Sequence, residues 1–340
     1  RLDNKCICKV KNNKLKIIPD RIKYLYIEVT NKCNLKCLHC YDDSSEVATQ
    51  SINLIDIKYF ISKFNNLECV NISGGEPLTW NYTIPLIKFL SEKKIRIRLI
   101  TNGTLLTSKK ISMLPKEAIS IQFTLTGHTS HIDSILRGKE AYQLTMNAII
   151  SALNLLPKEC IHISVMLNRQ NYKHLDELVQ SFIDRGISKI IFSFPVKQGR
   201  AINIWDDIQL SVIEKIQIVN KLEELRKKFK GQIQITYSGF PFEFVNVIKR
   251  VKDDLLLKKR LHEEITVLSS GEISYCAFSD TLRECCNSHN FHIRKPTIND
   301  SNPFILLVKK NTIDNIEDCS TCKKSFKCPG GCFSKMLTDK

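Results

Sequence analysis

The sequence has no apolar run long enough to cross a membrane, and residues 1–23 do not form a secretory signal peptide. A membrane-spanning helix needs about 18 or more consecutive apolar residues, and no apolar segment of this chain approaches that length. A signal peptide needs a basic segment, an apolar core and a small-residue cleavage site, which this N-terminus does not provide. We therefore expect a cytoplasmic protein without a membrane partner. Because the chain begins at Arg1 rather than Met, we also expect that an upstream segment is missing.

The chain also lacks a long basic block, although its formal net charge is +16. Such a charge fits an anionic partner, for example nucleic acid or an acidic peptide. It equally fits a solvated background charge, because the basic residues are mostly Lys scattered among Ile and Asn. We favour the background interpretation and expect no nucleic-acid partner. With 340 residues, the chain can bury a full core, and we expect one large domain and one smaller domain.

Cysteine, by contrast, is abundant, with 14 residues in a chain without export signals. In a reducing compartment such thiols are more often metal ligands than disulfide partners. Cys33, Cys37 and Cys40 lie in a polar loop after an alternating apolar run at 24–29, which predicts a buried strand. Iron–sulfur clusters are usually held by four Cys thiolates. Three close cysteines can therefore hold a 4Fe–4S cluster and leave one iron open to a substrate or cosubstrate.

Two other interpretations of this loop are a partial zinc knuckle and cysteines that bind no metal. A structural zinc site prefers a closed set of four ligands. No Cys occurs between residues 41 and 68, and the nearest candidate, His39, is the immediate neighbour of Cys40. We therefore favour the cluster.

A second motif follows the next predicted strand, at 69–73, and consists of Gly74, Gly75, Glu76 and Pro77. Two adjacent glycines let the backbone approach a ligand closely, and a Glu carboxylate accepts hydrogen bonds from an ammonium group. Together with the cysteine loop, this turn resembles the radical S-adenosylmethionine superfamily. The mark of that family is C-x3-C-x2-C after the first strand and Gly-Gly-Glu-Pro after the second.

The resemblance implies that Cys33, Cys37 and Cys40 hold a 4Fe–4S cluster. It also implies that the open iron is chelated by S-adenosyl-L-methionine, whose amino group contacts the Gly-Gly-Glu-Pro turn. The same resemblance assigns four further cofactor-binding residues, Tyr41, Asn102, Thr124 and Arg137. A guanidinium matches a carboxylate bidentately, which suits Arg137 to the cosubstrate carboxylate, but an ordinary surface or helix-capping arginine is equally compatible.

Three further positions are compared with the family pattern. Thr126 stands where related enzymes usually carry Asp, so a carboxylate role at this position is in doubt. Asn171 and the turn at 198–201 resemble positions near the adenosine of the cosubstrate. Both also suit ordinary turns, so their assignment depends on the resemblance.

The order of the predicted elements indicates an α/β fold with a parallel sheet. Strand-like runs lie at 24–29, 69–73, 95–101, 119–126, 161–167 and 189–194, and helical patterns lie at 53–64, 82–93, 108–114, 141–155 and 171–185. Strands that alternate with helices favour parallel β/α units, and β/α barrels place their sites at the carboxyl ends of the strands. The resemblance implies a partial parallel β/α barrel of six βα units.

We divide the chain into four parts. They are an N-terminal hairpin or extension at 1–23, the partial barrel at 24–204, a helical connecting region at 205–262 and a small cysteine-rich α+β domain at 263–340. In the connecting region we expect helices at 209–229 and 243–262 and a strand at 232–237. The last part begins with a predicted β-hairpin at 266–276.

The last part contains a second cysteine motif, formed by Cys319, Cys322, Cys328 and Cys332. On spacing alone, these cysteines fit a zinc ribbon. With Gly271 and Cys276 upstream they resemble the SPASM domain of peptide-modifying radical enzymes, which carries auxiliary 4Fe–4S clusters, and the resemblance assigns all five cysteines as ligands. The full pattern has seven cysteines, and residues 250–270 and 333–340 contain none. We therefore expect one auxiliary cluster, and a second only with an unusual ligand.

The resemblance implies an enzyme that reductively cleaves S-adenosyl-L-methionine to a 5′-deoxyadenosyl radical, which abstracts hydrogen from a peptide. We expect a thioether or carbon–carbon crosslink in a ribosomally synthesised peptide, with flavodoxin or ferredoxin as the electron donor. Ala277 stands where sulfatase-maturing relatives carry an Asp base, which argues against that reaction.

Two alternatives stay open. A peptide epimerase needs a hydrogen donor, and Cys285 or Cys286 would serve if they are not cluster ligands. A zinc-stabilised, basic nucleic-acid-binding protein fits the tail spacing and the charge, but it leaves the barrel pattern and the turn at 74–77 unexplained.

Overall fold

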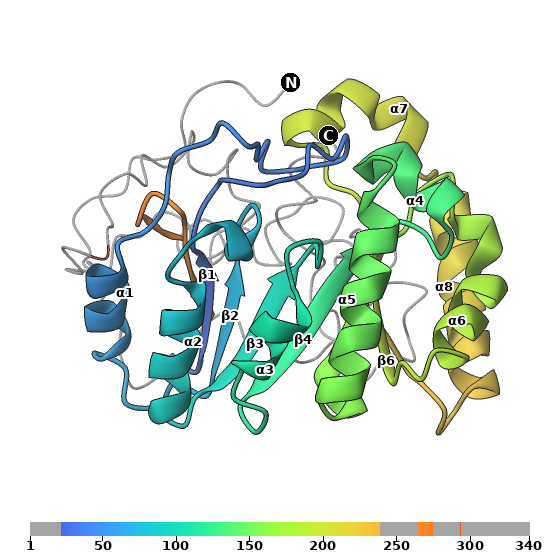
Figure 1. Cartoon of the computed structure of the whole chain (residues 1–340). Helices are drawn as coiled ribbons and strands as arrows, with labels where there is room; N and C mark the ends of the chain where they lie inside the picture. Colours follow the sequence, from blue (N-terminus) through green and yellow to red (C-terminus); the bar gives the residue numbers. More distant parts are fainter. Residues whose placement is uncertain (1–21, 239–263, 275–292, 294–340) are drawn as a thin grey trace, which may run out of the picture.

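The computed structural model describes residues 22–238, 264–274 and 293, and these residues form one curved sheet with helices on its outer side (Figure 1). The sheet order is β7-β6-β5-β4-β3-β2-β1-β8-β9. The strands are β1 (Tyr24–Glu28), β2 (Cys69–Ser73), β3 (Arg96–Thr101), β4 (Ile119–Leu125), β5 (Ile161–Met166), β6 (Lys189–Ser193), β7 (Gln234–Ser238), β8 (Glu264–Val267) and β9 (Ile273–Ser274). Strands β1 to β8 pair in parallel, and β9 is antiparallel to β8.

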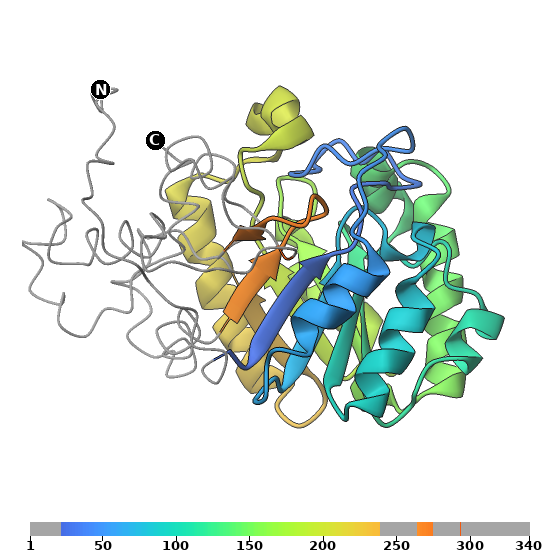
Figure 2. The same cartoon turned by 90° about the vertical axis from the view of Figure 1, so that its left-hand side faces the viewer.

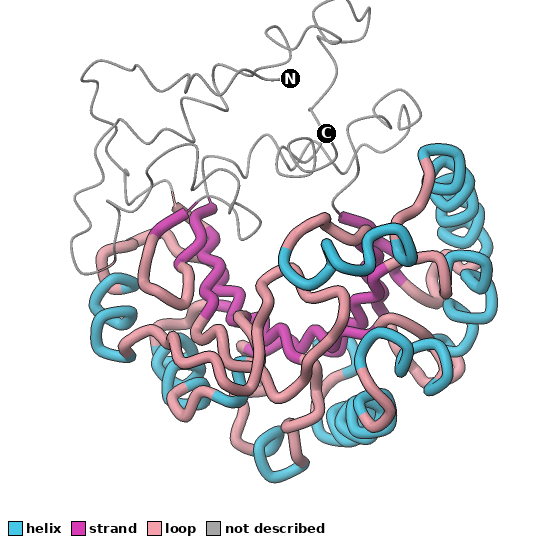
Figure 3. Tube along the Cα trace, turned by 90° about the horizontal axis from the view of Figure 1, so that it is seen from above, coloured by secondary structure: helices cyan, strands magenta, loops and turns pink. Residues whose placement is uncertain are grey.

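Helices connect the successive strands of this sheet. They are α1 (Leu54–Ile61), α2 (Thr83–Glu92), α3 (Ser108–Ser112), α4 (Ser130–Arg137), α5 (Ala141–Leu155), α6 (Leu175–Ile183), α7 (Trp205–Ile208) and α8 (Val212–Lys228), with short 3-10 turns η2 (Pro77–Thr79), η3 (Lys158–Cys160), η4 (Tyr172–His174) and η5 (Gly199–Ile204). Seen along the strands, the sheet is an open arc and the helices lie along its outer edge (Figure 3). The fold is the partial parallel β/α barrel that the sequence predicts.

Side-chain alternation along the strands explains why helices cover only one face. In β4 the apolar residues Ile119, Ile121 and Phe123 are fully buried, whereas the polar residues between them are half-buried. Successive side chains of a strand point to opposite faces, so the apolar set forms a single layer. This layer belongs to the same hydrophobic cluster as Phe60 of α1 and Ile149 of α5. The polar residues therefore face the inner side of the arc.

Three strands, β7, β8 and β9, extend the sheet beyond the predicted six. Strand β7 falls in the predicted connecting region, and it pairs with β6. Strand β8 falls in the predicted C-terminal domain, and it pairs with β1, as Figure 2 also shows (Figure 2). Strands β8 and β9 form the predicted hairpin at their described positions. The four domain boundaries remain predictions, but these pairings make both later parts continuous with the barrel sheet.

The remaining elements agree with the sequence in part. Helix α4 is absent from the predicted set; Thr129 caps it by accepting a hydrogen bond from the Ile132 N–H. Helix α8 begins at Ser211, whose side chain forms a capping box with Glu214. The predicted hairpin at 1–23 and the helix at 243–262 lie outside the described residues. Within the described ranges, no helix combines the length and apolar character that a membrane crossing requires.

Candidate functional site

The loop that follows β1 holds the three cysteines predicted as ligands. Cys33 is buried, Cys37 and Cys40 are half-buried, and all three are free thiols. The loop folds back on itself, because the Cys33 N–H donates to Ser45 O at 3.0 Å and the Cys40 N–H donates to Cys37 O at 3.3 Å. A further backbone donor, the Leu35 N–H, lies 3.4 Å from Cys33 Sγ. The three thiols are therefore presented by one backbone-stabilised loop at the carboxyl end of β1.

The electrostatics of this loop disfavour thiolates that lack a cationic partner. Burial raises the pKa of Cys33 to about 12 and raises the pKa values of Cys37 and Cys40. Negative charge on Cys37 or Cys40 would raise the pKa of Cys33 further. Iron supplies the positive charge that buried thiolates need. The donor set therefore fits a metal group.

The described residues provide no ready-made site for a single metal ion. Among residues 22–238, 264–274 and 293, no three His, Cys, Asp or Glu side chains converge on a point that could hold one metal ion. A closed zinc site requires such convergence, whereas each Cys of an iron–sulfur cluster ligates a different iron. His39, the nearest candidate for a fourth zinc ligand, is half-buried and belongs to no such group among these residues. The structure therefore gives no support to a zinc set completed by His39.

The turn formed by Gly74, Gly75 and Glu76 packs directly on the start of the cysteine loop. A Cβ at Gly74 would lie 2.3 Å from Thr30 O, and a Cβ at Gly75 would lie 2.4 Å from Lys32 O. The Gly75 N–H donates to Thr30 O at 2.7 Å and the Glu76 N–H donates to Lys32 O at 2.8 Å. The two glycines are thus required for contact between two backbone segments of the protein.

Glu76 joins this turn to the end of β3. Its side chain is 0% exposed. One carboxylate oxygen accepts hydrogen bonds from the Leu78 N–H at 3.0 Å and from Thr101 Oγ1 at 2.8 Å, and the other accepts from the Asn102 N–H at 2.8 Å. Burial raises the pKa of Glu76, and these three donors oppose that shift. The contact of Glu76 with a cosubstrate ammonium stays a prediction, because its carboxylate is enclosed by protein donors.

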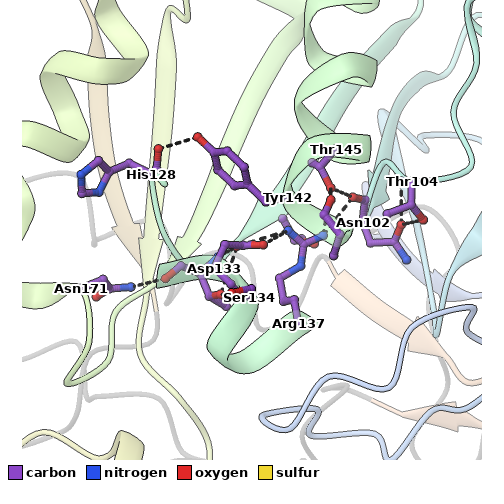
Figure 4. Close-up of polar contacts among 12 residues, drawn as sticks. Asn102, Thr104, His128, Asp133, Ser134, Arg137, Tyr142, Thr145 and Asn171 are labelled. Atoms are coloured by element: carbon purple, nitrogen blue, oxygen red, sulfur yellow. Dashed lines mark hydrogen bonds and ion pairs between the residues drawn. The ribbon is translucent and has the colours of Figure 1, made fainter. Parts of the chain in front are cut away.

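Asn102 connects the end of β3 to Cys33. Asn102 Nδ2 donates to Asn34 Oδ1 at 3.0 Å and lies 3.9 Å from Cys33 Sγ. Asn102 Oδ1 accepts from the N–H and the hydroxyl of Thr104, at 2.9 and 2.7 Å. Figure 4 shows Asn102 and Thr104 in this network (Figure 4). Asn102 therefore places its side-chain amide beside the thiol of Cys33, and its role in cofactor binding stays a prediction.

Arg137 occupies a buried network and is not a surface arginine. Its Nη1 donates to both oxygens of Asp133, at 3.3 and 3.0 Å, and its Nη2 donates to Asn102 O and Thr145 Oγ1, each at 3.1 Å (Figure 4). These contacts use four of the five N–H donors of a guanidinium. Binding of a cosubstrate carboxylate by Arg137 stays a prediction that would require some of these bonds to rearrange.

The carboxyl ends of β4 and β5 are tied together by side chains. Asp133 Oδ1 accepts from the Thr126 N–H at 2.7 Å, so a carboxylate is present near the position where the sequence has Thr126. Asn171, which is fully buried, donates from Nδ2 to Thr126 O at 2.9 Å and to Met166 O at 2.7 Å. The side chain of Asn171 therefore supports the backbone around a prospective adenosine site.

Tyr41 and Thr124 complete the described set of predicted cofactor residues. Tyr41 Oη donates to Glu28 Oε1 at 3.3 Å, and burial raises the pKa of the Tyr41 phenol. Thr124 Oγ1 donates to Thr101 O at 3.4 Å, at the carboxyl end of β4. Both residues therefore lie at the same end of the sheet as the cysteine loop.

The structure adds Arg200, whose contact with the cysteine loop no sequence pattern predicts. The Arg200 N–H donates to Cys40 O, and Arg200 Nε donates to Cys37 O, each at 2.9 Å. The two cysteines and Arg200 come from opposite sides of the arc, and 163 positions separate Cys37 from Arg200. The turn at 198–201, which the resemblance places near adenosine, thus touches the predicted cluster loop itself.

The other predicted site residues lie outside the described residues. They are Cys276, Cys285, Cys286, Cys319, Cys322, Cys328 and Cys332. Their assignment to auxiliary clusters, or to a hydrogen donor, therefore stays a prediction.

Comparison with known proteins identifies relatives of this site. The model of the radical SAM superfamily matches residues 27–182. Mycofactocin maturase MftC of Mycolicibacterium smegmatis is 25% identical over 198 residues, which cover 57% of this chain and 50% of MftC. The subtilosin biosynthesis protein AlbA of Bacillus subtilis is 24% identical over 183 residues, which cover 52% of this chain and 40% of AlbA. The chain spans about half the length of the curated relatives it matches.

Solved structures share the fold over nearly the whole chain. Streptococcus suis SuiB bound to the precursor peptide SuiA superimposes with a TM-score of 0.72 at 17% identity, covering 94% of this chain and 74% of SuiB. Native anSMEcpe with bound AdoMet and the Cp18Cys peptide gives a TM-score of 0.65 at 16% identity, covering 94% of this chain and 91% of that chain. At these identities the similarity establishes the fold.

Proposed function

We propose that this chain, whose residues 27–182 match the model of the radical SAM superfamily, is an enzyme of that superfamily. It reductively cleaves S-adenosyl-L-methionine and uses the resulting 5′-deoxyadenosyl radical to abstract hydrogen from a peptide. One observation carries the proposal: the backbone of the loop that holds three free thiols is hydrogen-bonded, at Thr30 and Lys32, to the turn at Gly75 and Glu76. The loop and the turn both lie at the carboxyl ends of their strands, where β/α barrels perform their chemistry.

A 4Fe–4S cluster held by Cys33, Cys37 and Cys40 would supply the electron that breaks the bond between the sulfonium and the adenosyl 5′ carbon. The residues of the chain have positioning roles in this scheme. Glu76 holds the glycine turn against the end of β3, and Asn102 presents its amide to Cys33. We assign to the protein two contributions to this cofactor radical chemistry, positioning of the reactants and exclusion of water from a reactive intermediate.

The proposed substrate is a ribosomally synthesised peptide in which a thioether or carbon–carbon crosslink forms. Relatives support this substrate class, since MftC and AlbA are named for maturation and bacteriocin biosynthesis and SuiB has been solved with a precursor peptide. Crosslinking removes two hydrogens from the peptide. The first leaves as a hydrogen atom and forms 5′-deoxyadenosine. The second leaves as a proton and an electron, and we assign that electron to an auxiliary 4Fe–4S cluster. Its ligands would come from the predicted set Cys276, Cys319, Cys322, Cys328 and Cys332.

The decisive experiment is anaerobic turnover of the reconstituted protein with dithionite and S-adenosyl-L-methionine. Release of 5′-deoxyadenosine, measured by liquid chromatography and mass spectrometry, is the expected result, and Cys37→Ala should abolish it. Cys160→Ala is the matched control, because Cys160 is also a half-buried free thiol but lies before β5, at the opposite end of the strands. An iron-loaded wild-type protein that releases no 5′-deoxyadenosine would overturn the proposal.

The peptide product separates the bond types. A candidate precursor peptide, incubated in deuterated solvent, should lose two hydrogens in mass if a crosslink forms. An unchanged covalent composition with one deuterium taken up from solvent would instead identify an epimerase. With flavodoxin or ferredoxin in place of dithionite, turnover should persist, because both proteins deliver single electrons.

A further inference from the structure

We infer that Arg200 is a positioning residue for the cysteine loop and that its charge raises the reduction potential of the cluster bound there. The inference rests on the proposed function and deepens it, because it concerns how the chain controls the electron-accepting site. It is carried by a contact between the two sides of the arc. Strand β1 leads into the cysteine loop and β6 leads into η5, and four strands separate β1 from β6 in the sheet.

The Arg200 guanidinium bonds to both ends of the loop segment that contains Cys40. Nε donates to Cys37 O at 2.9 Å, Nη2 donates to Ser44 O at 2.8 Å, and Nη1 donates to Asp43 Oδ1 at 2.7 Å. Because these donors belong to one rigid plane, they fix the distance between the two carbonyls. Figure 1 shows the loop after β1 running across the top of the sheet toward α7, which directly follows η5 (Figure 1).

The backbone at Gly199 is built for this contact. Gly199 has φ +57, and a Cβ there would lie 2.5 Å from Tyr41 O and 2.6 Å from Cys40 O. Any other residue would therefore push the two segments apart. Because the two backbone segments are packed against each other at Gly199, the contact between Arg200 and the loop is fixed by the backbone. An ion pair between mobile surface side chains has no such support.

The charge of Arg200 acts on two of the three thiols. Its guanidinium donates to the Cys37 carbonyl and its backbone N–H donates to the Cys40 carbonyl, each at 2.9 Å, so the charge is held beside both residues. A cluster becomes more negative when it is reduced, so a fixed cation beside its ligands stabilises the reduced form and raises the potential. Asp43 offsets part of this charge. Its side chain is 71% exposed and that of Arg200 is 13% exposed, so solvent screens the carboxylate more strongly.

Arg137 also lies at this end of the sheet, where it donates to Asn102 O, but its charge is matched by Asp133 inside the core. Arg200 is therefore the guanidinium whose removal changes the charge at the loop most directly. Three variants separate its charge from its bonds. Arg200→Gln removes both the charge and the guanidinium hydrogen bonds. Arg200→Lys keeps the charge but loses the planar set of guanidinium donors. Asp43→Asn keeps Arg200 and removes the opposing carboxylate.

The test is a redox titration of the reconstituted holoenzyme, followed by electron paramagnetic resonance. The relevant cluster is the one whose signal changes when S-adenosyl-L-methionine is added. At a fixed potential, Arg200→Gln should lower its ratio of reduced to oxidised form about tenfold, which is about 59 mV for one electron. Asp43→Asn should shift the ratio in the opposite direction. Arg200→Lys should keep a near-native potential but lose iron faster to a chelator.

Matched controls keep the test decisive. Arg96→Gln removes one positive charge at the amino end of β3, where Arg96 is 68% exposed, and should leave the potential unchanged. Asp43 has φ +49, a conformation that Asn adopts readily, so Asp43→Asn should fold even if an Arg200 variant does not.

Two outcomes are distinguishable. Unchanged potentials in Arg200→Gln and Asp43→Asn, with the responsive signal intact, would overturn this inference alone. A wild-type protein without any signal that responds to S-adenosyl-L-methionine would overturn the proposed function and this inference with it.

Discussion

The carboxylate of Glu76 accepts a hydrogen bond from the backbone N–H of Asn102 at 2.8 Å, so the glycine turn and the residue beside Cys33 are one connected unit. The carboxyl ends of β2 and β3, which are neighbours in the sheet, thereby both contact the cysteine loop. The pairing explains why an acidic side chain is placed in a fully buried position: it serves three donors that would otherwise lack partners.

We predict that Glu76→Gln destabilises the protein by about 1–3 kcal/mol, because one amide N–H₂ replaces an acceptor oxygen and leaves a buried donor unpaired. Urea unfolding of the reconstituted protein measures the change. Glu117→Gln is the control, since Glu117 is exposed. A Glu76→Gln protein as stable as the wild type would show that the three hydrogen bonds contribute little.

Gly75→Ala should reduce iron bound by the cysteine loop. The new Cβ would lie 2.4 Å from Lys32 O, a backbone atom, so the loop must move. Gly186→Ala provides the contrast, because a Cβ there meets nothing within 4 Å and only the positive φ is strained. We expect Gly186→Ala to cost about 1 kcal/mol of stability and to retain its iron. Iron analysis after anaerobic reconstitution distinguishes the two; equal iron in both variants would contradict the prediction.

Arg137→Met should destabilise the fold by about 3–5 kcal/mol, because it leaves the buried Asp133 carboxylate without its cation. The two side chains are 2% and 0% exposed, so solvent cannot replace the lost partner. The double variant Asp133→Asn/Arg137→Met should recover part of the loss. Chemical denaturation of the wild type, the single variants Arg137→Met and Asp133→Asn, and the double variant forms a double-mutant cycle. A double variant whose loss equals the sum of the two single losses would indicate independent sites.

His162 should make the protein less stable in mild acid. Burial is the main cause that lowers its pKa to about 4 from an ordinary 6.5, so the unfolded chain binds more protons between these values. The contribution of neutral His162 to the free energy of unfolding is therefore fully present above pH 6.5 and is lost as the pH drops toward 4. Between pH 7.5 and pH 5 we expect the wild type to lose about 2 kcal/mol more than His162→Asn. Urea unfolding at both pH values tests this, and identical losses would contradict it.

Cys33 should react slowly with iodoacetamide in the metal-free protein. The thiolate is the nucleophile, and burial raises the pKa of Cys33 to about 12, so little thiolate is present at pH 8. Peptide mapping by mass spectrometry after timed alkylation gives the rates. The half-buried Cys69 is the internal reference, and Cys33 should be modified at least tenfold more slowly. Faster modification of Cys33 would mean that the loop opens without metal.

Local patterns predict much of this fold. The strand of β2 is predicted at its observed bounds, and the cysteine loop and glycine turn follow their strands as expected. Helix α4 is missed because its first turn is polar and its apolar positions are few. The membership of β7 and β8 in the sheet is also missed, since strand pairing joins segments that are distant in sequence and leaves no periodic trace.

The site shows the same division. Sequence motifs identify Cys33 and Gly75 because their spacing is short and their residue types are distinctive. They do not identify what each residue contacts: Glu76 accepts from Thr101 and Asn102, and Gly75 lies against Lys32. Arg200 lies in the predicted turn at 198–201, but its contact with the cysteine loop depends on the curvature of the sheet, which brings the loops after β6 and β1 together.

The pairing of β8 with β1 has a consequence for how this chain can be cut. β1, which supports the cysteine loop, is hydrogen-bonded on both sides, by β2 and by β8. Ending the polypeptide before residue 264 would remove β8 and leave the backbone N–H and C=O groups on that side of β1 unpaired. Such an exposed edge strand promotes association with other chains. Shortened versions meant to isolate the catalytic half should therefore retain residues 264–274.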